Sequence, residues 1–201
     1  MSDELISRLD RIYASINATL ESDMTQLPAK VLQDDGIVGI CQDFAGNLTE
    51  AEIENRAYTV IQNVANLRDH LKRWGATNRP NIAEVDNTFN SSMDIQIIAD
   101  LCNNDKHGYP PRGSGHSGRR PKLINPRAIL RVTGRNVRMM LGSHGVPKIQ
   151  GGTAIAIITG EVVDEDGNTL GDLYDIALRA VKSWELLLKE LGLLRPDDAG
   201  P

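Results

Sequence analysis

The sequence predicts a mainly α fold, in which a helical bundle carries a small antiparallel β-sheet inserted before the C-terminal helix. In most of the chain, apolar residues recur every three or four positions, which is the period of a helix buried on one face. Between residues 128 and 163 this period gives way to short runs rich in Val and Ile, which favour strands. The helical period returns after Asp172, so we expect the sheet to interrupt a single bundle.

Two long helices are predicted in the first 75 residues, joined by a connection over residues 34–47. The first helix covers residues 3–25, from the spacing of Leu5, Leu9, Ile12, Ile16 and Leu20. Thr49 and Glu52 fit a capping box at the start of the second helix, which runs to Gly75. Its apolar stripe consists of Ile53, Ala57, Val60, Val64, Leu67, Leu71 and Trp74. A polar line beside the stripe needs partners from a neighbouring helix, and consists of Arg56, Asn63, Asn66, His70 and Arg73.

A short helical piece is predicted to open at Pro80, and a longer helix starts at Ser91 or Ser92 and ends at Gly108. The apolar face of the longer helix consists of Ile95, Ile98, Leu101 and Cys102. At about 100° per residue, Asp100, Asn104 and His107 fall on one side of this helix, and Asn103 lies one turn before His107. The end of the helix therefore presents a polar surface.

After a loop over residues 108–122, the small sheet is predicted from runs at residues 128–132, 137–141 and 153–163, followed by a turn at Asp166-Gly167. Asp172 caps the last helix, whose stripe consists of Leu173, Ile176, Ala177, Ala180, Trp184, Leu187, Leu188 and Leu191. At 201 residues the chain suits one domain. We expect that domain to span residues 1–201, with the bundle in 3–107 and 170–193, the basic loop and sheet in 108–169, and a flexible tail in 195–201.

The composition indicates a cytoplasmic protein with no membrane span and no bound cofactor. The two cysteines, Cys41 and Cys102, form neither a pairing motif nor a metal motif, and no apolar run is long enough to cross a membrane or to act as a secretory leader. Only two Phe, two Trp and four Tyr are present. Aromatic platforms for stacking single-stranded bases are therefore scarce.

The charge of −5 is unevenly distributed along the chain. No Asp or Glu lies between Lys106 and Gly160, whereas that segment holds ten cations: Lys106, Arg112, Arg119, Arg120, Lys122, Arg127, Arg131, Arg135, Arg138 and Lys148. The rest of the chain holds the other 12 cations and all 27 acidic residues. The basic segment therefore either packs against the acidic body of the same protein or meets an anionic partner, either RNA or an acidic protein.

Residues 113–118, Gly-Ser-Gly-His-Ser-Gly, match the G-x-G-x-x-G pattern of dinucleotide-binding sites. Such sites need a strand before the glycines and a helix after them, whereas here a helix precedes and Arg-Arg-Pro follows, so a dinucleotide site is excluded. Two interpretations remain: a solvated loop, or a loop whose amides wrap an oxyanion or phosphate. In the second interpretation, the cations available to the loop are Arg112, Arg119, Arg120 and Lys122.

His70 and His107 lie near helix ends, and each has a carboxylate close to it in the sequence. Asp69 directly precedes His70, and Asp105 lies two residues before His107. A histidine with a nearby carboxylate can act as a general acid or base near neutral pH. The alternative is a histidine that forms structural hydrogen bonds at the margin of a bundle. No helix carries a His-x-x-x-His or Glu-x-x-His pair, so we expect no metal site.

Two segments together resemble uncharacterised bacterial proteins related to the HEPN superfamily: residues 67–71, Leu-Arg-Asp-His-Leu, and residues 99–108, Ala-Asp-Leu-Cys-Asn-Asn-Asp-Lys-His-Gly. The motif of that superfamily is an arginine, a polar residue that is often Asn, a few residues and then a histidine. Here Asn103 occupies the polar position, His107 the histidine position and Cys102 the arginine position. The resemblance covers about residues 48–108.

The resemblance implies an all-helical, commonly dimeric protein that binds RNA and, in many members, cleaves it without a metal in toxin, antiphage and RNA-processing systems. It implies that His107 moves a proton during attack of the ribose 2′-hydroxyl, with Asn103 and Asp105 orienting it and with His70 and Asp69 completing the cluster. Cys102 supplies no fixed cation, so phosphate contacts are expected first from Lys106 and Arg112, with Arg68 and Arg73 as substitutes. The basic segment adds Arg119, Arg120 and Lys122. In a homodimer, two half-sites would form one groove.

Two further functions are consistent with the sequence. In the first, the protein is a non-catalytic interaction or dimerisation module whose basic segment docks on an acidic face. A buried polar network then fixes the register of the helices, and it consists of Asp69, His70, Asn103, Asp105 and His107. In the second, the protein is a small-molecule enzyme that uses the glycine-rich loop as a phosphate clamp.

Overall fold

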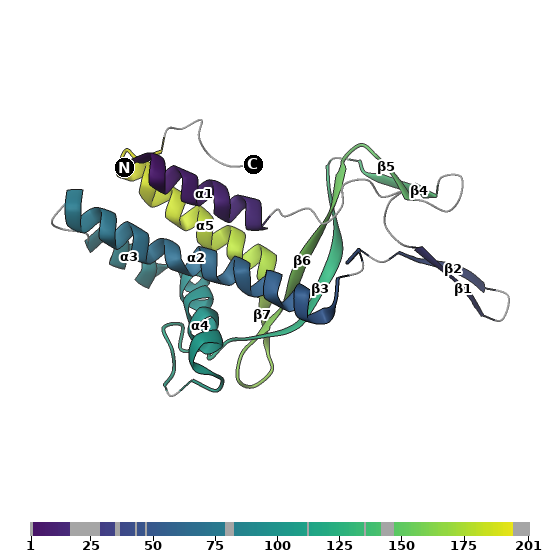
Figure 1. Cartoon of the computed structure of the whole chain (residues 1–201), viewed down its shortest axis with the longest axis horizontal. Coiled ribbons are helices and arrows are strands. Elements are labelled where there is room, and N and C mark those ends of the chain that lie inside the picture. Colours follow the sequence, from purple (N-terminus) through teal and green to yellow (C-terminus); the bar gives the residue numbers. More distant parts are fainter. Residues whose placement is uncertain are drawn as a thin grey trace.

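Helices dominate the part of the chain that the structure describes, which is residues 2–16, 29–34, 37–42, 44–46, 48–78, 83–111, 113–134, 136–141 and 147–194. In this computed structural model the helices are α1 (Ser2–Ile16), α2 (Glu50–Asn78), α3 (Ala83–Ser91), α4 (Met93–His107) and α5 (Leu173–Glu190) (Figure 1). The strands are β1 (Ala29–Asp34), β2 (Ile37–Gln42), β3 (Lys122–Thr133), β4 (Arg138–Leu141), β5 (Pro147–Gln150), β6 (Thr153–Val163) and β7 (Thr169–Asp172). The predicted mainly α fold with a small antiparallel sheet before the last helix is confirmed.

Local sequence signals mark the start of α2 and the end of α4. Thr49 and Glu52 form the predicted capping box, in which the Thr49 N–H donates to the Glu52 carboxylate over 2.8 Å and the Glu52 N–H donates to Thr49 Oγ1 over 3.3 Å. Gly108 ends α4 with a φ of +85°, and its N–H donates to the Asn104 carbonyl over 2.8 Å. Glycine adopts this backbone conformation without the strain that a side chain would add.

The hydrophobic core lies where α1, α2, α4 and α5 meet. α2 packs against α1, α4 and α5, and α4 crosses below the other long helices in Figure 1. Trp184 of α5 is fully buried at the centre of this core, as are Ile61 of α2 and Ile98 of α4. The predicted stripe of α2 is buried from Ile53 to Leu71, and the helix continues past the predicted end at Gly75. The predicted part of the first helix after Ile16 lies outside the described residues, as does the tail from residue 195.

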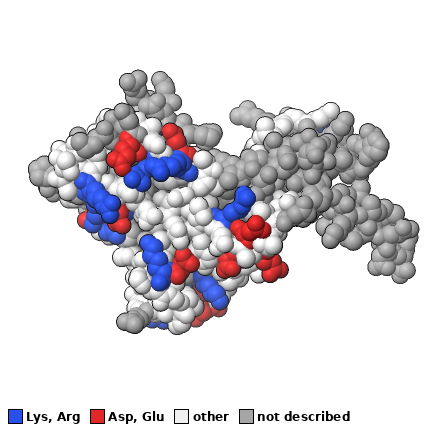
Figure 2. Space-filling model, viewed as in Figure 1, with Lys and Arg blue, Asp and Glu red and all other residues white. Residues whose placement is uncertain are grey.

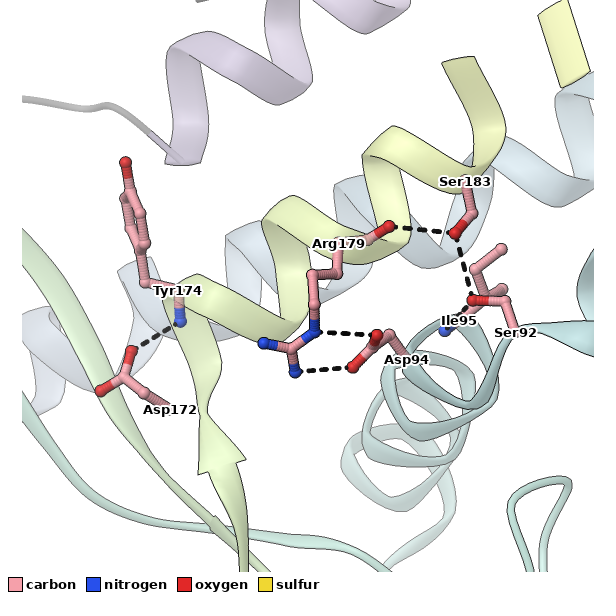
Figure 3. Close-up of polar contacts among 7 residues, drawn as sticks. All are labelled: Ser92, Asp94, Ile95, Asp172, Tyr174, Arg179 and Ser183. Carbon is pink, nitrogen blue, oxygen red and sulfur yellow. Dashed lines mark hydrogen bonds and ion pairs between the residues drawn. The ribbon is translucent and has the colours of Figure 1, made fainter. Parts of the chain in front are cut away.

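Polar contacts fix the start of α4 against α5 (Figure 3). Ser92 caps α4 by accepting a hydrogen bond from the Ile95 N–H, and its hydroxyl lies 3.3 Å from the hydroxyl of Ser183 on α5. The Arg179 guanidinium donates two hydrogen bonds to the Asp94 carboxylate, over 2.8 and 3.0 Å. A bidentate pair of this kind sets an orientation as well as a distance, so it holds α4 at one angle across α5.

The β insertion is more extensive than predicted. β3, β6 and β7 form an antiparallel sheet with β6 in the centre, and β3 and β6 extend together as a long ribbon (Figure 1). β3 starts at Lys122 rather than at residue 128, because a bulge between Ile124 and Arg127 accommodates Pro126, which has no N–H for the ladder. The run at 137–141 does not join this sheet and pairs with β5 instead.

The prediction of a plain connection over residues 34–47 is wrong. β1 and β2 pair antiparallel as a hairpin, from Ala29 opposite Gln42 to Asp34 opposite Ile37. The two strands are separated in the sequence by Asp35-Gly36, a dipeptide that favours two-residue hairpin turns. That dipeptide is the signal from which the hairpin could have been predicted.

Candidate functional site

The end of α4 opens into a hollow of about 470 Å³. Its lining consists of Asn103, Asn104, His107, Gly108, Pro110 and Pro111. Asn103 and His107 are four residues apart on the helix, so their side chains lie on the same face, and both are exposed. Gly108 ends the helix, and Pro110 and Pro111 complete the lining. The structure therefore brings together two of the predicted catalytic residues, His107 and Asn103.

Asp105 and Cys102 have other surroundings. The Asp105 carboxylate accepts a hydrogen bond from the Gln62 side chain over 2.9 Å, so it ties α4 to α2 instead of orienting the His107 imidazole. Cys102 is 2% exposed and belongs to the hydrophobic core. The position that holds arginine in the HEPN motif therefore faces the protein interior here, and a cation for this hollow has to come from another position.

His70 and Asp69 lie on α2 and do not line this hollow. Asp69 is exposed, whereas His70 lines two cavities beside Arg8 of α1. Burial lowers the pKa of His70, and the neighbouring charges of Arg8 and Arg73 lower that pKa further. His70 is therefore neutral near pH 7 and belongs to the contact between α1 and α2.

The predicted buried network of Asp69, His70, Asn103, Asp105 and His107 is wrong, because four of these five side chains are exposed and His70 is half-buried. A buried polar network does exist, and its centre is Asp100, which is 3% exposed. The Asp100 carboxylate accepts hydrogen bonds from the His116 N–H (2.7 Å), the Ser117 N–H (2.8 Å) and the Ser117 hydroxyl (2.6 Å). Three donors satisfy a carboxylate that would otherwise be costly to bury.

The glycine-rich loop therefore does bind an anion, but the anion is the carboxylate of the protein's own Asp100. Gly115 has a φ of +71°, and a β-carbon at this position would lie 2.6 Å from Asp100 Oδ2. Only glycine fits such a close approach. Because Asp100 occupies the amides of His116 and Ser117, the proposed phosphate clamp of a small-molecule enzyme lacks these two donors.

Other contacts fix the rest of the loop at the margin of the hollow. The Asn104 side chain donates to the Pro121 carbonyl over 2.9 Å, so this lining residue also anchors the end of the loop. The Tyr109 hydroxyl donates to the Arg120 carbonyl over 3.4 Å. The Lys122 ammonium lies 5.6 Å from the centre of the Tyr109 ring, close enough for a cation–π contact. Lys122 therefore lies next to Tyr109, which directly precedes Pro110 and Pro111 of the lining.

The basic segment is partly neutralised by the acidic body. Arg120 pairs with Glu165 at 2.5 Å, and Arg131 pairs with Asp175 at 3.2 Å while stacking on Tyr174. On the face shown in Figure 2, basic and acidic side chains lie next to one another over the helical body and form no continuous basic patch. The interpretation that the segment packs against its own body therefore holds for Arg120 and Arg131.

Three other predicted phosphate contacts remain exposed: Lys106, Arg119 and Lys122. Arg112 lies outside the described residues. Arg68, a predicted substitute for the missing arginine, has a structural role, because it pairs with Asp86 at 2.8 Å and lies 3.6 Å from the centre of the Phe89 ring. The exposed cations that remain are therefore Lys106 on α4, Arg119 on the loop and Lys122 at the start of β3, and none of the three lines the hollow.

Within the described residues, no group of three His, Cys, Asp or Glu side chains is placed to hold a metal ion. None of the helices there is both long and apolar enough to cross a membrane. Comparison of the sequence with family models, with curated proteins and with solved structures finds no match. Any functional conclusion therefore depends on the geometry of the site and on the short HEPN-like motif.

Proposed function

We propose that this protein binds RNA at the hollow beside Asn103 and His107, and that His107 transfers a proton in metal-independent cleavage of the RNA backbone. The observation that carries the proposal is the shared hollow itself: the two residues that match the HEPN-like motif, Asn103 and His107, line it together and are exposed to a ligand. Asp100 and Asn104 on the same helix have partners within the protein. Asn103 and His107 are thus set apart from their polar neighbours.

Exposed cations on α4 and on the segment that follows it support binding of a phosphodiester backbone. Lys106, Arg119 and Lys122 are exposed, and Lys122 is positioned by Tyr109. Three phosphate contacts on a single strand correspond to a slope of about −2 in a plot of log binding constant against log salt concentration. A flat response to salt would contradict a polyanionic ligand.

The chemistry requires only proton transfer. The His107 imidazole accepts the proton of the ribose 2′-hydroxyl while the 2′-oxygen forms a bond to phosphorus and the bond from phosphorus to the 5′-oxygen breaks. The departing 5′-oxygen takes up a proton, and the products are a 2′,3′-cyclic phosphate and a 5′-hydroxyl. Asn103 offers an amide donor to a phosphate oxygen, and the cations offset the charge that develops there.

A homodimer is part of this proposal. One hollow supplies one imidazole, whereas the reaction removes a proton from one oxygen and delivers a proton to another. A two-fold axis beside α4 would bring a second His107 to the opposite side of the same phosphate. The oligomeric state of the purified protein, measured by sedimentation, tests this arrangement.

The deciding experiment incubates mixed RNA in EDTA with the wild-type protein, with His107→Ala and with His116→Gln as the matched histidine control. His116 is exposed and lies outside the hollow, and glutamine preserves the backbone N–H that binds Asp100. We expect cleavage by the wild type and by His116→Gln, and none by His107→Ala. Retention of RNA without cleavage would contradict the role of His107 in proton transfer. Neither retention nor cleavage would overturn the proposal and favour a module that docks on an acidic protein.

A further inference from the structure

A second polar region lies between α1 and α2, and none of its lining residues lines the His107 hollow. Two cavities of about 70 and 240 Å³ lie there, and Arg8 and His70 line both of them. The smaller cavity adds Arg11, Asn63 and Asn66, and the larger one adds Arg73, Trp74 and Glu4. We call this region the Arg8 groove and define it by Arg8, Arg11, Asn63, Asn66, His70 and Arg73. It contains most of the polar line that the sequence places beside the apolar stripe of α2.

The groove has an excess of positive charge. Three arginines line it, and the carboxylate among its lining residues is that of Glu4, which pairs with Arg8 at 2.9 Å. This pair joins residues four apart on α1, with the Glu4 side chain exposed and the Arg8 side chain half-buried, so Glu4 offsets one of the three arginine charges. Arg11 donates to the Ser7 carbonyl and not to a carboxylate. Arg11 and Arg73 therefore line the groove without an anionic partner among the described residues.

The Arg8 guanidinium is incompletely satisfied. Its Nε is buried and has no hydrogen-bond partner among the residues that the structure describes. A guanidinium presents five N–H donors, and leaving a buried donor unpaired is unfavourable. Because this Nε is out of contact with solvent, an oxyanion in the groove would be bound by the terminal nitrogens of the guanidinium.

The neutral donors of the groove fit the same kind of ligand. Asn63 and Asn66 carry amide groups, and the pKa of His70 is lowered by burial, by Arg8 and by Arg73, against the opposing effects of Glu4 and Asp69. The neutral imidazole can donate one hydrogen bond. An anion bound between the arginines would offset their charges and raise the pKa of His70.

We propose that the Arg8 groove binds a phosphate group, held by Arg8 and Arg73 and by a hydrogen bond from His70. Both cavities are smaller than the roughly 300–1,000 Å³ of pockets that enclose drug-sized ligands, so the groove takes the phosphate and not the rest of a large molecule. The ligand is inorganic phosphate or the terminal phosphate of a monoester. This site is independent of the RNA proposal and shares no residue with the His107 hollow.

The test follows the imidazole resonances of the intact protein by NMR while inorganic phosphate is added at constant ionic strength, with sodium chloride as the reference salt. We expect a saturable shift of the His70 resonance and an increase in its pKa, with His107 and His116 unchanged. Fluorescence gives a second readout, because Trp74 lines the groove whereas Trp184 is fully buried in the core. Methyl phosphate in a parallel titration distinguishes the sources: binding of both supports a monoester ligand, and binding of inorganic phosphate alone supports the free ion.

Variants decide whether the groove is responsible. Loss of a charge-assisted hydrogen bond should weaken phosphate binding about tenfold or more in Arg8→Gln. Arg73→Gln gives the same test at an exposed residue, where folding is not at risk. Arg127→Gln, an exposed arginine on β3, is the matched control and should bind phosphate like the wild type. The proposal is overturned if His70 shows no saturable shift beyond that in chloride, if all histidines shift in parallel, or if Arg73→Gln binds unchanged.

Discussion

Asp100 and His107 lie on one side of α4, about two turns apart, but they have opposite surroundings. Asp100 is covered by residues 113–118 and receives three hydrogen bonds from that loop. His107 lies beyond the covered part of the helix and faces an open hollow. The same side of one helix therefore holds a polar centre for folding and a polar centre available to a ligand.

The difference shows how burial separates two uses of polar residues. A covered polar group has to be fully paired because water no longer reaches it, so its variants act on stability. An uncovered polar group can remain unpaired at little cost, so its variants act on binding or chemistry. The pairs of variants below compare neighbouring residues of the same type in the two environments.

The largest effect is expected for Asp100→Ala. This change leaves the N–H groups of His116 and Ser117 and the Ser117 hydroxyl without their acceptor, and should lower the free energy of unfolding by about 3 kcal/mol or more. Asp105→Ala removes an exposed carboxylate from the same helix and should cost no more than about 1 kcal/mol. Urea denaturation of both variants measures the difference. Equal losses would contradict the assignment of Asp100 as the anchor of the loop.

Gly115→Ala should have the next largest effect. The new methyl group would meet the Asp100 carboxylate at a positive φ, and should destabilise the protein by about 2 kcal/mol. Gly113→Ala is the control, since nothing lies within 4 Å of a β-carbon at that position. Its change should stay within about 0.5 kcal/mol. Thermal denaturation that ranks the two variants in the reverse order would show that the loop is not held against Asp100.

Asn104→Ala should destabilise the protein by about 1 kcal/mol, because the hydrogen bond to the Pro121 carbonyl is lost. The adjacent residue is the control: Asn103 is exposed, and Asn103→Ala should leave stability within about 0.5 kcal/mol of the wild type. RNA binding should show the opposite order, with the larger loss in Asn103→Ala. A single order in both measurements would mean that the two environments are not distinct.

The smallest effect on stability is expected for His107→Ala, within about 0.5 kcal/mol, because the side chain is exposed. RNA cleavage should nevertheless be lost in this variant. Urea denaturation and the cleavage assay, performed on the same preparation, check both parts. Strong destabilisation by His107→Ala would show that His107, like Asp100, stabilises the fold.

Much of the helical framework was predictable because its signals are local. The capping box at Thr49 and Glu52, the glycine stop at Gly108 and the cap at Asp172 depend on residues within one turn of each helix end. The hairpin of β1 and β2 had an equally local signal in Asp35-Gly36, but the flanking runs are short and mixed, and Gly39 interrupts the second. The extent of β3 was not predictable in the same way, since Pro126 interrupts the run that continues across the bulge.

The candidate site was predictable only in part. The spacing of Asn103 and His107 placed them together, because residues four apart on a helix share a face. Spacing could not show that Asp105 turns to Gln62, 43 residues away in the sequence, or that Cys102 faces the core. It also could not show that the loop at Ser117 returns to cover Asp100.

The sequence by itself determined the helices, their caps, the insertion of a sheet and the pair of Asn103 and His107, because periodicity and capping act over one or two turns. Only the tertiary structure decided which polar residues are free. The crossing of α4 below α2, the return of the loop and the position of α1 assign Asp100 to the interior, His70 to the Arg8 groove and His107 to the open hollow. These assignments depend on contacts between residues far apart in the sequence, which no local pattern encodes.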